Sequence, residues 1–346
     1  MKNKKFILII AGLFVAACLG LVAFYMNGIG SVSSSKDKVV VVVDKGKGSS
    51  QILEVLDDAG LVKNKFAAKI FLKLNKYDHL QANTYLFSES MSLKDMYDVM
   101  ENPTGEYLSS IKFTVIDGQS AQNVAQSIAD ILKIKKEDVL TKWRDKTYLQ
   151  SLIDTYWFID SRILNNNLMF TLEGYLYPET YFIYGEDYTI ESITKLALDM
   201  MDQKLTPYKD KIKDLGWSAH EFLTFVSVVQ RETLFDKDLS KIAGVFMNRL
   251  KINMAMQSDI TVNYAWQRTG VDVSIKHTQI DSPYNTYKYR GLPVGPICNI
   301  NEKSMKACLD YEKNDYYYFF AKQDGEVIYT KTYDEHLKAV KENKWY

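Results

Sequence analysis

An uncharged stretch of 21 residues, Phe6 to Met26, is the feature that most limits how this chain can fold. At a rise of 1.5 Å per residue, a helix of this length can cross a hydrocarbon core of about 30 Å. Three lysines stand before the stretch, and the next charged residue is Lys36. The positive-inside rule then predicts a single transmembrane helix at residues 6–26, with residues 1–5 in the cytoplasm and the remainder outside.

A short segment with several glycines and serines, residues 27–36, follows this stretch and is predicted to be a flexible linker. A cleaved signal peptide is the alternative to an uncleaved anchor. Val15-Ala16-Ala17-Cys18 resembles a lipoprotein processing site, but the apolar run continues beyond Cys18, which favours the anchor. All of these alternatives place the body of the protein outside the cytoplasm.

The composition excludes several classes of protein. The 346 residues include 43 Lys and Arg and 43 Asp and Glu, so the chain has no excess of positive charge with which to neutralise nucleic-acid phosphates. A hydrophobic content of 47% is that of a packed globular protein and not of a disordered one. The 24 tyrosines offer flat apolar faces that carry hydroxyls, and both sugars and peptides bind such surfaces.

Cysteine and histidine do not form a pattern typical of metal sites. Cys298 and Cys308 are the only cysteines of the exported part, and neither lies in a CxxC or Cys/His spacing. Their separation would allow a disulfide, although two buried thiols are the favoured interpretation. The four histidines are scattered and form no HExxH motif. We therefore predict neither a metal ion nor another cofactor.

Two domains of the α+β class are predicted after the linker. Residues 37–104 read as a β-α-α-β-α module that starts with a β-branched strand, and Ser49 is a candidate cap for its first helix. Residues 109–346 read as a larger α+β domain, and the turn-forming sequence Asn-Pro-Thr-Gly before it marks the break. Within the larger domain, Glu173 and Tyr177 belong to the segment LEGYLYPETY, which could line a sugar groove or form a surface strand.

A capping box at Ser218 and Glu221 predicts the start of a helix that runs to Thr233. On this helix Glu232 continues an apolar stripe. Partial burial and the nearby helix C-terminus should both raise the pKa of its carboxyl, as a general acid requires. The alternative is a structural ion pair with Arg249 or another base.

Polar residues and rigid turns follow in loops that could line a cleft. Several motifs occur in order along the chain: LEGYLYPETY at 172–181, VxxET ending at Thr233, FMNRL at 246–250, QSDITVNY at 257–264, YNTY at 284–287, GLPVGPI at 291–297 and Thr332 to His336. In this combination the chain resembles the MltG or YceG-like family of endolytic lytic transglycosylases of bacterial peptidoglycan, and the resemblance covers nearly the whole chain.

The resemblance implies a set of roles. The family's catalytic glutamate falls on Glu232, and residues 37–104 correspond to a LysM-like module. Members often carry another acid at the position of Gln230, which leaves Glu232 without a rival here. Substrate binding is expected from Gln257, Ser258, Asp259, Tyr264, Asn285, Thr286, Tyr287, Glu173 and Tyr177, although each could be structural instead. Loop-holding roles are expected for Arg249, Gly291, Pro293, Gly295 and His336.

The implied reaction cleaves the β-1,4 bond between N-acetylmuramic acid and N-acetylglucosamine within a glycan strand and leaves a 1,6-anhydro end. It would terminate or trim nascent strands at the outer side of the bacterial inner membrane, with cell-wall synthesis proteins as candidate partners. Two alternatives stay open. A hydrolase would need a second carboxyl, for which Asp259 is the candidate in the neighbouring motif. A non-catalytic scaffold would only bind the cell wall.

Overall fold

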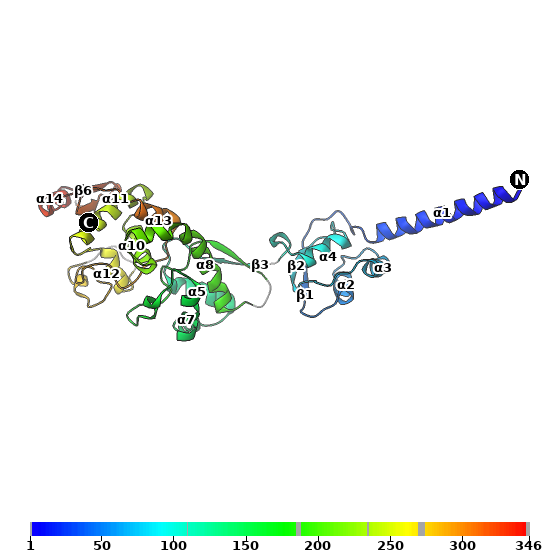
Figure 1. The fold of residues 1–346 in the computed structure, drawn as a ribbon, viewed down its shortest axis with the longest axis horizontal. Helices are drawn as coiled ribbons and strands as arrows, with labels where there is room; N and C mark the ends of the chain where they lie inside the picture. The colour runs from blue at the N-terminus through cyan, green and yellow to red at the C-terminus, as the bar shows by residue number, and fades with distance from the viewer. Residues whose placement is uncertain (1, 109, 185–187, 234, 269–273, 344–346) are drawn as a thin grey trace. The chain divides into compact units, whose positions relative to one another are not determined.

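The computed structural model describes residues 2–108, 110–184, 188–233, 235–268 and 274–343, and all side chains within these ranges except those of residues 2–9, 11, 110 and 184. The chain divides into two compact units (Figure 1). The first consists of Met1–Ile111 with Phe182–Tyr188, and the second of Lys112–Tyr181 with Thr189–Tyr346. Helices and small sheets alternate in both, so the predicted α+β class is confirmed.

The first unit contains the predicted β-α-α-β-α order after its N-terminal helix. Its elements are α1 (Lys2–Gly28), β1 (Val39–Val43), α2 (Ser49–Asp58), α3 (Lys65–Leu74), β2 (Asn83–Phe87), α4 (Leu93–Glu101) and the 3-10 turn η1 (Gly105–Tyr107). Strand β1 pairs antiparallel with β2, with Val41 opposite Tyr85. The cap of α2 differs from the prediction: Gly48 precedes the helix and donates its N–H to the Gln51 side chain at 2.9 Å, so Ser49 is already the first helical residue.

The core of the first unit lies between the two-stranded sheet and its helices. Val41 and Val43 point into this core, whereas the alternate residues Val40 and Val42 are exposed, as the period of a half-buried strand requires. The rings of Tyr85 and Phe87 stack at a centroid distance of 5.2 Å. Apolar residues of α2, α3 and α4 complete the cluster.

Helix α1 ends against this module. An added Cβ on Gly28 would lie 2.5 Å from the Ala67 Cβ of α3, so only glycine permits this approach. The following segment, which was predicted to be a flexible linker, forms backbone hydrogen bonds with the module: Leu93 N–H donates to the Ile29 carbonyl at 3.0 Å, and Ser33 N–H donates to the Glu89 carbonyl at 3.1 Å.

No helix in the described part of the chain combines the length and apolar character that a membrane span requires. Part of the predicted span, residues 6–9 and 11, lies outside the described side chains. The transmembrane helix therefore stays a prediction.

The second unit is mainly helical. Strands β3 (Ser110–Thr114) and β4 (Thr180–Tyr184) each cross the boundary between the units. The other elements of the second unit are α5 (Ala121–Leu132), α6 (Lys136–Lys142), α7 (Lys146–Thr155), η2 (Ser161–Leu164), α8 (Ile190–Leu205), η3 (Thr206–Tyr208), α9 (Lys209–Asp214), α10 (Ala219–Glu232), α11 (Asp236–Lys251), α12 (Asp259–Ala265), η4 (His277–Gln279), α13 (Glu302–Leu309), β5 (Tyr318–Ala321), β6 (Val327–Thr330) and α14 (Tyr333–Asn343).

Helix α10 is the central helix of this unit. The predicted capping box is confirmed, since Ser218 Oγ accepts from Glu221 N–H at 3.2 Å and the Glu221 carboxylate accepts from Ser218 N–H at 2.8 Å. Every residue from Phe222 to Val229 is buried, and the helix packs against α11, α12 and α13. Cys298 and Cys308 are buried free thiols, as favoured from the sequence.

The last part of the chain folds onto α11. Strands β5 and β6 pair antiparallel, with Tyr318 opposite Thr330, and α14 packs against both strands. Strand β5 also contacts α11. The β5-β6-α14 segment thereby faces the C-terminal end of α10 across a pocket.

Candidate active site

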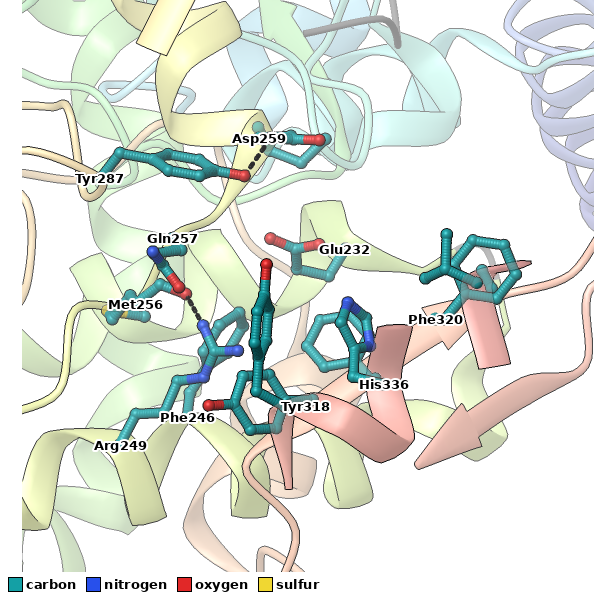
Figure 2. Close-up of a pocket in the computed structure, with 15 residues that line it drawn as sticks. Glu232, Phe246, Arg249, Met256, Gln257, Asp259, Tyr287, Tyr318, Phe320 and His336 are labelled. Carbon is teal, nitrogen blue, oxygen red and sulfur yellow. Dashed lines mark hydrogen bonds between the residues drawn. The ribbon is translucent and has the colours of Figure 1, made fainter. Parts of the chain in front are cut away.

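The pocket beside Glu232 has a volume of about 520 Å³. Figure 2 shows Glu232 in its middle, with Asp259 and Tyr287 above it and Tyr318 and His336 below it in this view. These side chains come from distant parts of the sequence. The complete lining is Glu232, Phe246, Arg249, Met256, Gln257, Asp259, Ile260, Tyr287, Tyr318, Phe319, Phe320, Ala321, Tyr333, His336 and Val340.

Glu232 is the last residue of α10, and its carboxyl is desolvated although the residue keeps some exposed surface. Burial raises the pKa of this carboxyl to about 7, because desolvation disfavours the charged form; a hydrogen bond from Ser258 and the charge of Arg249 oppose the shift, and the charge of Asp259 adds to it. Among the described residues Glu232 forms no ion pair with Arg249. The structural alternative weighed from the sequence is therefore not observed.

Ser258 donates its hydroxyl hydrogen bond to Glu232 Oε1. Thr286 fixes the backbone of this serine, because Thr286 Oγ1 accepts from Ser258 N–H at 3.0 Å and its carbonyl accepts from Gln257 N–H at 3.1 Å. Gln257 lies in the left-handed region with φ of 52°, which is uncommon for a residue other than glycine. The loop is thus held in a strained turn that directs Ser258 at the glutamate.

The second carboxyl of the pocket belongs to Asp259. It accepts a hydrogen bond of 2.6 Å from the Tyr287 hydroxyl. Burial raises the pKa of Asp259, and the Tyr287 hydrogen bond opposes that shift. The adjacent Asn285 is fully buried, and its Oδ1 accepts from Tyr287 N–H at 3.0 Å, so it supports the loop from behind the pocket.

Arg249 connects two walls of the pocket. Its Nε donates to the Tyr317 carbonyl at 2.6 Å and Nη1 donates to the Met256 carbonyl, while the guanidinium lies 5.2 Å from the ring centroid of Tyr318. Burial lowers the pKa of Arg249 from its ordinary value. The side chain joins α11 to β5 and to the loop before α12, which agrees with a structural function.

His336 reaches the pocket from α14. Its ring stacks on that of Tyr318 at a centroid distance of 5.4 Å. Its buried Nδ1 has no hydrogen-bond partner among the described residues. Burial lowers the pKa of His336, and the charge of Arg249 lowers it further, so the ring is neutral at pH 7.

Of the nine residues that were expected to bind substrate, three line this pocket: Gln257, Asp259 and Tyr287. The other six do not line it: Ser258, Tyr264, Asn285, Thr286, Glu173 and Tyr177. Glu173 is 1% exposed; its carboxyl accepts from Ala121 N–H at 2.8 Å and from the Tyr264 hydroxyl at 3.0 Å. Burial raises the pKa of Glu173 to about 8, against the effect of these two donors. Tyr264 is therefore also engaged in the core and does not line the pocket.

The segment around Glu173 is core because of one close approach. Gly174 has a φ of +80°, and an added Cβ would lie 2.4 Å from the Pro296 Cβ. Tyr177 is buried as well, and its carbonyl accepts from the Tyr181 hydroxyl at 2.6 Å. The structure therefore brings neither Glu173 nor Tyr177 to the pocket, in contrast to the sugar groove considered from the sequence.

The glycine- and proline-rich loop at 291–297 is also outside the pocket. Gly295 allows close contact, because an added Cβ would lie 2.5 Å from the Leu168 Cδ2 atom. Pro293 lines a separate surface hollow next to His220, and Gly291 has a φ of +88°. These positions agree with loop-holding functions.

Four aromatic residues of the pocket were not predicted from the sequence. Phe246, Tyr318, Phe320 and Tyr333 all line the pocket and form its aromatic wall. The run Tyr-Tyr-Tyr-Phe-Phe at 316–320 was the available signal, but such a run is also typical of a core strand.

Comparison with known proteins gives consistent matches. The model of the YceG-like family matches residues 41–342. The chain is 35% identical over 306 residues to the endolytic murein transglycosylase of Bacillus subtilis (strain 168), covering 88% of this chain and 84% of that protein. It is 32% identical over 329 residues to the endolytic murein transglycosylase of Streptococcus pneumoniae serotype 2 (strain D39 / NCTC 7466), covering 90% of this chain but 59% of that longer protein.

A solved structure is similar as well. The 2.6 Å crystal structure of a yceG-like protein from Listeria monocytogenes matches with a TM-score of 0.64 and 35% identity. The match covers 88% of this chain and 99% of that one.

Proposed function

The chain belongs to the YceG-like family, as its sequence motifs predicted, and we propose that it is an endolytic murein transglycosylase with Glu232 as its catalytic residue. One observation carries the proposal. The Glu232 carboxyl lies in a cavity of about 520 Å³, and burial raises its pKa to about 7. A carboxyl of this kind can hold a proton near neutral pH and release it to a substrate.

The reaction needs only one such group. Protonated Glu232 donates its proton to the glycosidic oxygen that leaves with C4 of N-acetylglucosamine, as the bond from that oxygen to C1 of N-acetylmuramic acid breaks. The 6-hydroxyl oxygen of the same muramyl residue forms a new bond to C1, which gives the 1,6-anhydro end. The Glu232 carboxylate accepts the hydroxyl proton and returns to its starting form. No water is consumed.

Ser258 has a specific part in this cycle. Its hydroxyl donates to Glu232 Oε1, which stabilises the carboxylate formed halfway through the reaction. The other carboxyl oxygen has no hydrogen bond with a described residue, so it is the candidate for proton transfer. Ser258 is thus proposed to be a positioning residue rather than a contact of the sugar.

Sugar rings are proposed to lie along the aromatic wall. Tyr287, Tyr318 and Tyr333 offer flat faces on which the apolar side of a pyranose ring can stack. Gln257 offers hydrogen bonds for hydroxyl and N-acetyl groups, and the His336 ring lines the same pocket. Glu173, Tyr177 and Tyr264 are not proposed to contact the substrate, because they are buried in the core and do not line the pocket.

Asp259 is the group that would make the enzyme a hydrolase. A retaining or inverting glycosidase requires its second carboxyl to attack the sugar or to activate water. Here Asp259 accepts a short hydrogen bond from Tyr287, which favours a function in holding that ring in place. We therefore propose that Asp259 positions the Tyr287 ring in the pocket.

Helix α1 is proposed to anchor the protein in the inner membrane, N-terminus inside. Its described large apolar side chains are exposed, among them Leu13, Phe14 and Leu21, each at 66% or more. A helix that is apolar all round needs an apolar environment, and the interior of a bilayer provides one. Held there, the enzyme would act outside the cytoplasm and cut glycan strands where synthesis proteins extend them, with residues 37–104 as a LysM-like module that binds glycan.

The test is a digestion of purified peptidoglycan by the full chain in detergent, with product ends identified by mass spectrometry. Anhydro ends, each lighter by one water than a reducing end, are expected from the unchanged chain. The Glu232→Gln variant should release them at least about a hundredfold more slowly. Glu221→Gln is the matched control on the same helix, because glutamine also completes a capping box.

Each other result points to a different function. Reducing ends from the unchanged chain would identify a hydrolase and contradict the lyase mechanism. Binding to peptidoglycan without release of any fragment would favour a cell-wall-binding scaffold. Equal activity of Glu232→Gln and Glu221→Gln would remove Glu232 from catalysis.

A further inference from the structure

Residues 63–76 form the most basic part of the first unit. The sequence KNKFAAKIFLKLNK contains five lysines and no acidic residue, and α3 occupies its centre. The chain as a whole has equal numbers of basic and acidic residues. This concentration of charge is therefore local, and the proposed reaction does not use it.

Helix α3 carries apolar residues on two sides. Ala67, Ala68 and Phe71 are buried in the core of the module. Phe66 and Leu74 point away from that core and are 67% and 70% exposed. Large exposed apolar side chains of this kind mark a surface that contacts another apolar phase.

Most of the lysines have no partner that neutralises them. Lys65 is paired with Glu54 at 2.5 Å and with Asp57 at 2.6 Å. The other four, at positions 63, 69, 73 and 76, are exposed and form no ion pair with any described residue. Basic residues mixed with exposed Phe and Leu are typical of helices that lie in the headgroup region of a membrane.

The position of α3 relative to α1 supports this interpretation. Gly28, the last residue of α1, packs on Ala67 of α3 so closely that an added Cβ would meet it at 2.5 Å. Tyr25 and Ile29 also pack against the module core. In Figure 1, α3 lies at the end of α1, while β1 lies farther from it. If α1 is the membrane anchor, α3 lies at the height at which the chain leaves the bilayer.

A hollow of about 450 Å³ lies on the same face, between α2 and α3. Its lining includes Phe66, Lys69 and Lys73 from α3, with Ser49 and Ser50 from the start of α2. Ammonium groups and hydroxyls beside an apolar ring are the groups that bind a phosphodiester attached to an acyl chain. Glu54 also lines this hollow, but its carboxylate is already paired with Lys65.

We propose that residues 63–76 dock the first unit onto the anionic lipid surface from which α1 emerges, with Phe66 and Leu74 in the headgroup region and the four unpaired lysines on lipid phosphates. The inference rests on the proposed anchor. The exposed apolar residues favour a lipid surface over a soluble polyanion, which would offer them no apolar phase. Docking would give the module a second attachment to the bilayer, beside α1.

The experiment uses the full chain in vesicles of phosphatidylcholine, alone or mixed with phosphatidylglycerol, with bromine on the acyl chains. The five native tryptophans all lie outside the first unit. A Phe66→Trp variant therefore reports bromine quenching at α3 as an increment over the unchanged chain. Val40→Trp is the matched control, because Val40 is 60% exposed on β1 of the same module.

We expect strong quenching of Phe66→Trp in the mixed vesicles, weaker quenching in phosphatidylcholine alone, and little for Val40→Trp in either. Each lysine near an anionic surface changes the equilibrium ratio of docked to undocked forms roughly fivefold. Adding Lys69→Gln and Lys73→Gln should therefore lower the ratio of docked to undocked forms by about twentyfold or more. High salt should act in the same direction.

Equal quenching of Phe66→Trp and Val40→Trp in the mixed vesicles would overturn the proposal. If soluble poly(glycerol phosphate) or glycan fragments abolish the quenching of Phe66→Trp, the ligand of residues 63–76 is that polymer and not the lipid. Flotation with phosphatidylcholine vesicles tests α1 separately, and peptidoglycan digestion tests Glu232 separately. Salt-dependent flotation with the mixed vesicles only would support docking by α3 while contradicting the anchor.

Discussion

Glu232 and Glu173 are two glutamates of the same unit that have desolvated carboxyls but different surroundings. Burial raises both pKa values, to about 7 and about 8, and each carboxyl accepts a hydrogen bond from a hydroxyl. Glu232 opens onto a pocket, whereas Glu173 is enclosed and holds the first residue of α5. A raised pKa therefore does not identify a catalytic acid. Access of substrate to the carboxyl makes the difference.

The largest effect should come from the same substitution at both sites. Glu232→Gln removes the exchangeable proton and should lower kcat by about 10²–10⁴-fold, the usual contribution of general acid-base catalysis. Glu173→Gln should keep kcat within a few-fold of the unchanged chain, because its carboxyl touches no substrate. Rates of anhydro-end formation measure both. A thousandfold loss of kcat in Glu173→Gln with unchanged folding would contradict the view that only Glu232 acts on the substrate.

The pH dependence of stability should rank the two glutamates in the opposite order, with a larger contribution from Glu173 than from Glu232. Burial raises the pKa of Glu173 from its ordinary value of 4.5 to about 8, so the folded protein holds this proton more tightly than the unfolded chain does. Its contribution is complete below pH 4.5 and is lost as the pH rises through about 8, by on the order of 5 kcal/mol. Glu173→Gln should flatten this decline in denaturant titrations. An unchanged slope would show that Glu173 is ionised in the fold.

Ser258→Ala should shift the alkaline limb of activity. Catalysis requires protonated Glu232, so kcat should fall above about pH 7 in the unchanged chain. The Ser258 hydroxyl favours the carboxylate, and its loss should raise the pKa of Glu232 and move the limb upward by on the order of one pH unit. Thr286 still holds the backbone at this position, so the loop should keep its form. A limb that moves downward contradicts the assignment.

Asp259→Asn should give the smallest effect. The charge of Asp259 raises the pKa of Glu232, so its removal should move the alkaline limb down by a fraction of a pH unit. Asparagine can still accept from the Tyr287 hydroxyl, which keeps the wall in place. The pH profile of kcat is the measurement. A hundredfold loss of kcat at every pH would instead assign Asp259 the part of a second catalytic carboxyl.

Local signals predicted the elements well. The capping box at Ser218 set the start of α10, and the helical period placed Glu232 at the end of its apolar stripe. The order of elements in residues 37–104 also followed from local patterns. Such patterns are readable because a cap, a strand period and a helix face each depend on residues within a few positions of one another.

Contacts between distant segments were not predictable in the same way. Glu173 was a candidate for the groove because its segment is rich in aromatic residues, yet the close approach of Gly174 and Pro296 buries it. Tyr318 forms a wall opposite Glu232 only because β5 folds back onto α11. Composition shows that a residue can stack on a sugar, but it does not show which surface the residue faces.

The pocket wall from β5 and α14 also sets when the enzyme can begin to work. Glu232 is synthesised about a hundred residues before Val340, which closes the far side of the same pocket. At a translation rate of about 5 to 20 residues per second, roughly 5 to 20 s pass between the synthesis of Glu232 and that of Val340. During this interval the side of the pocket formed by β5 and α14 is incomplete. A nascent chain at that stage would contain Glu232 but could not yet bind a glycan strand in the complete pocket. Biosynthesis itself would then delay the first cut until the β5-β6-α14 segment has folded.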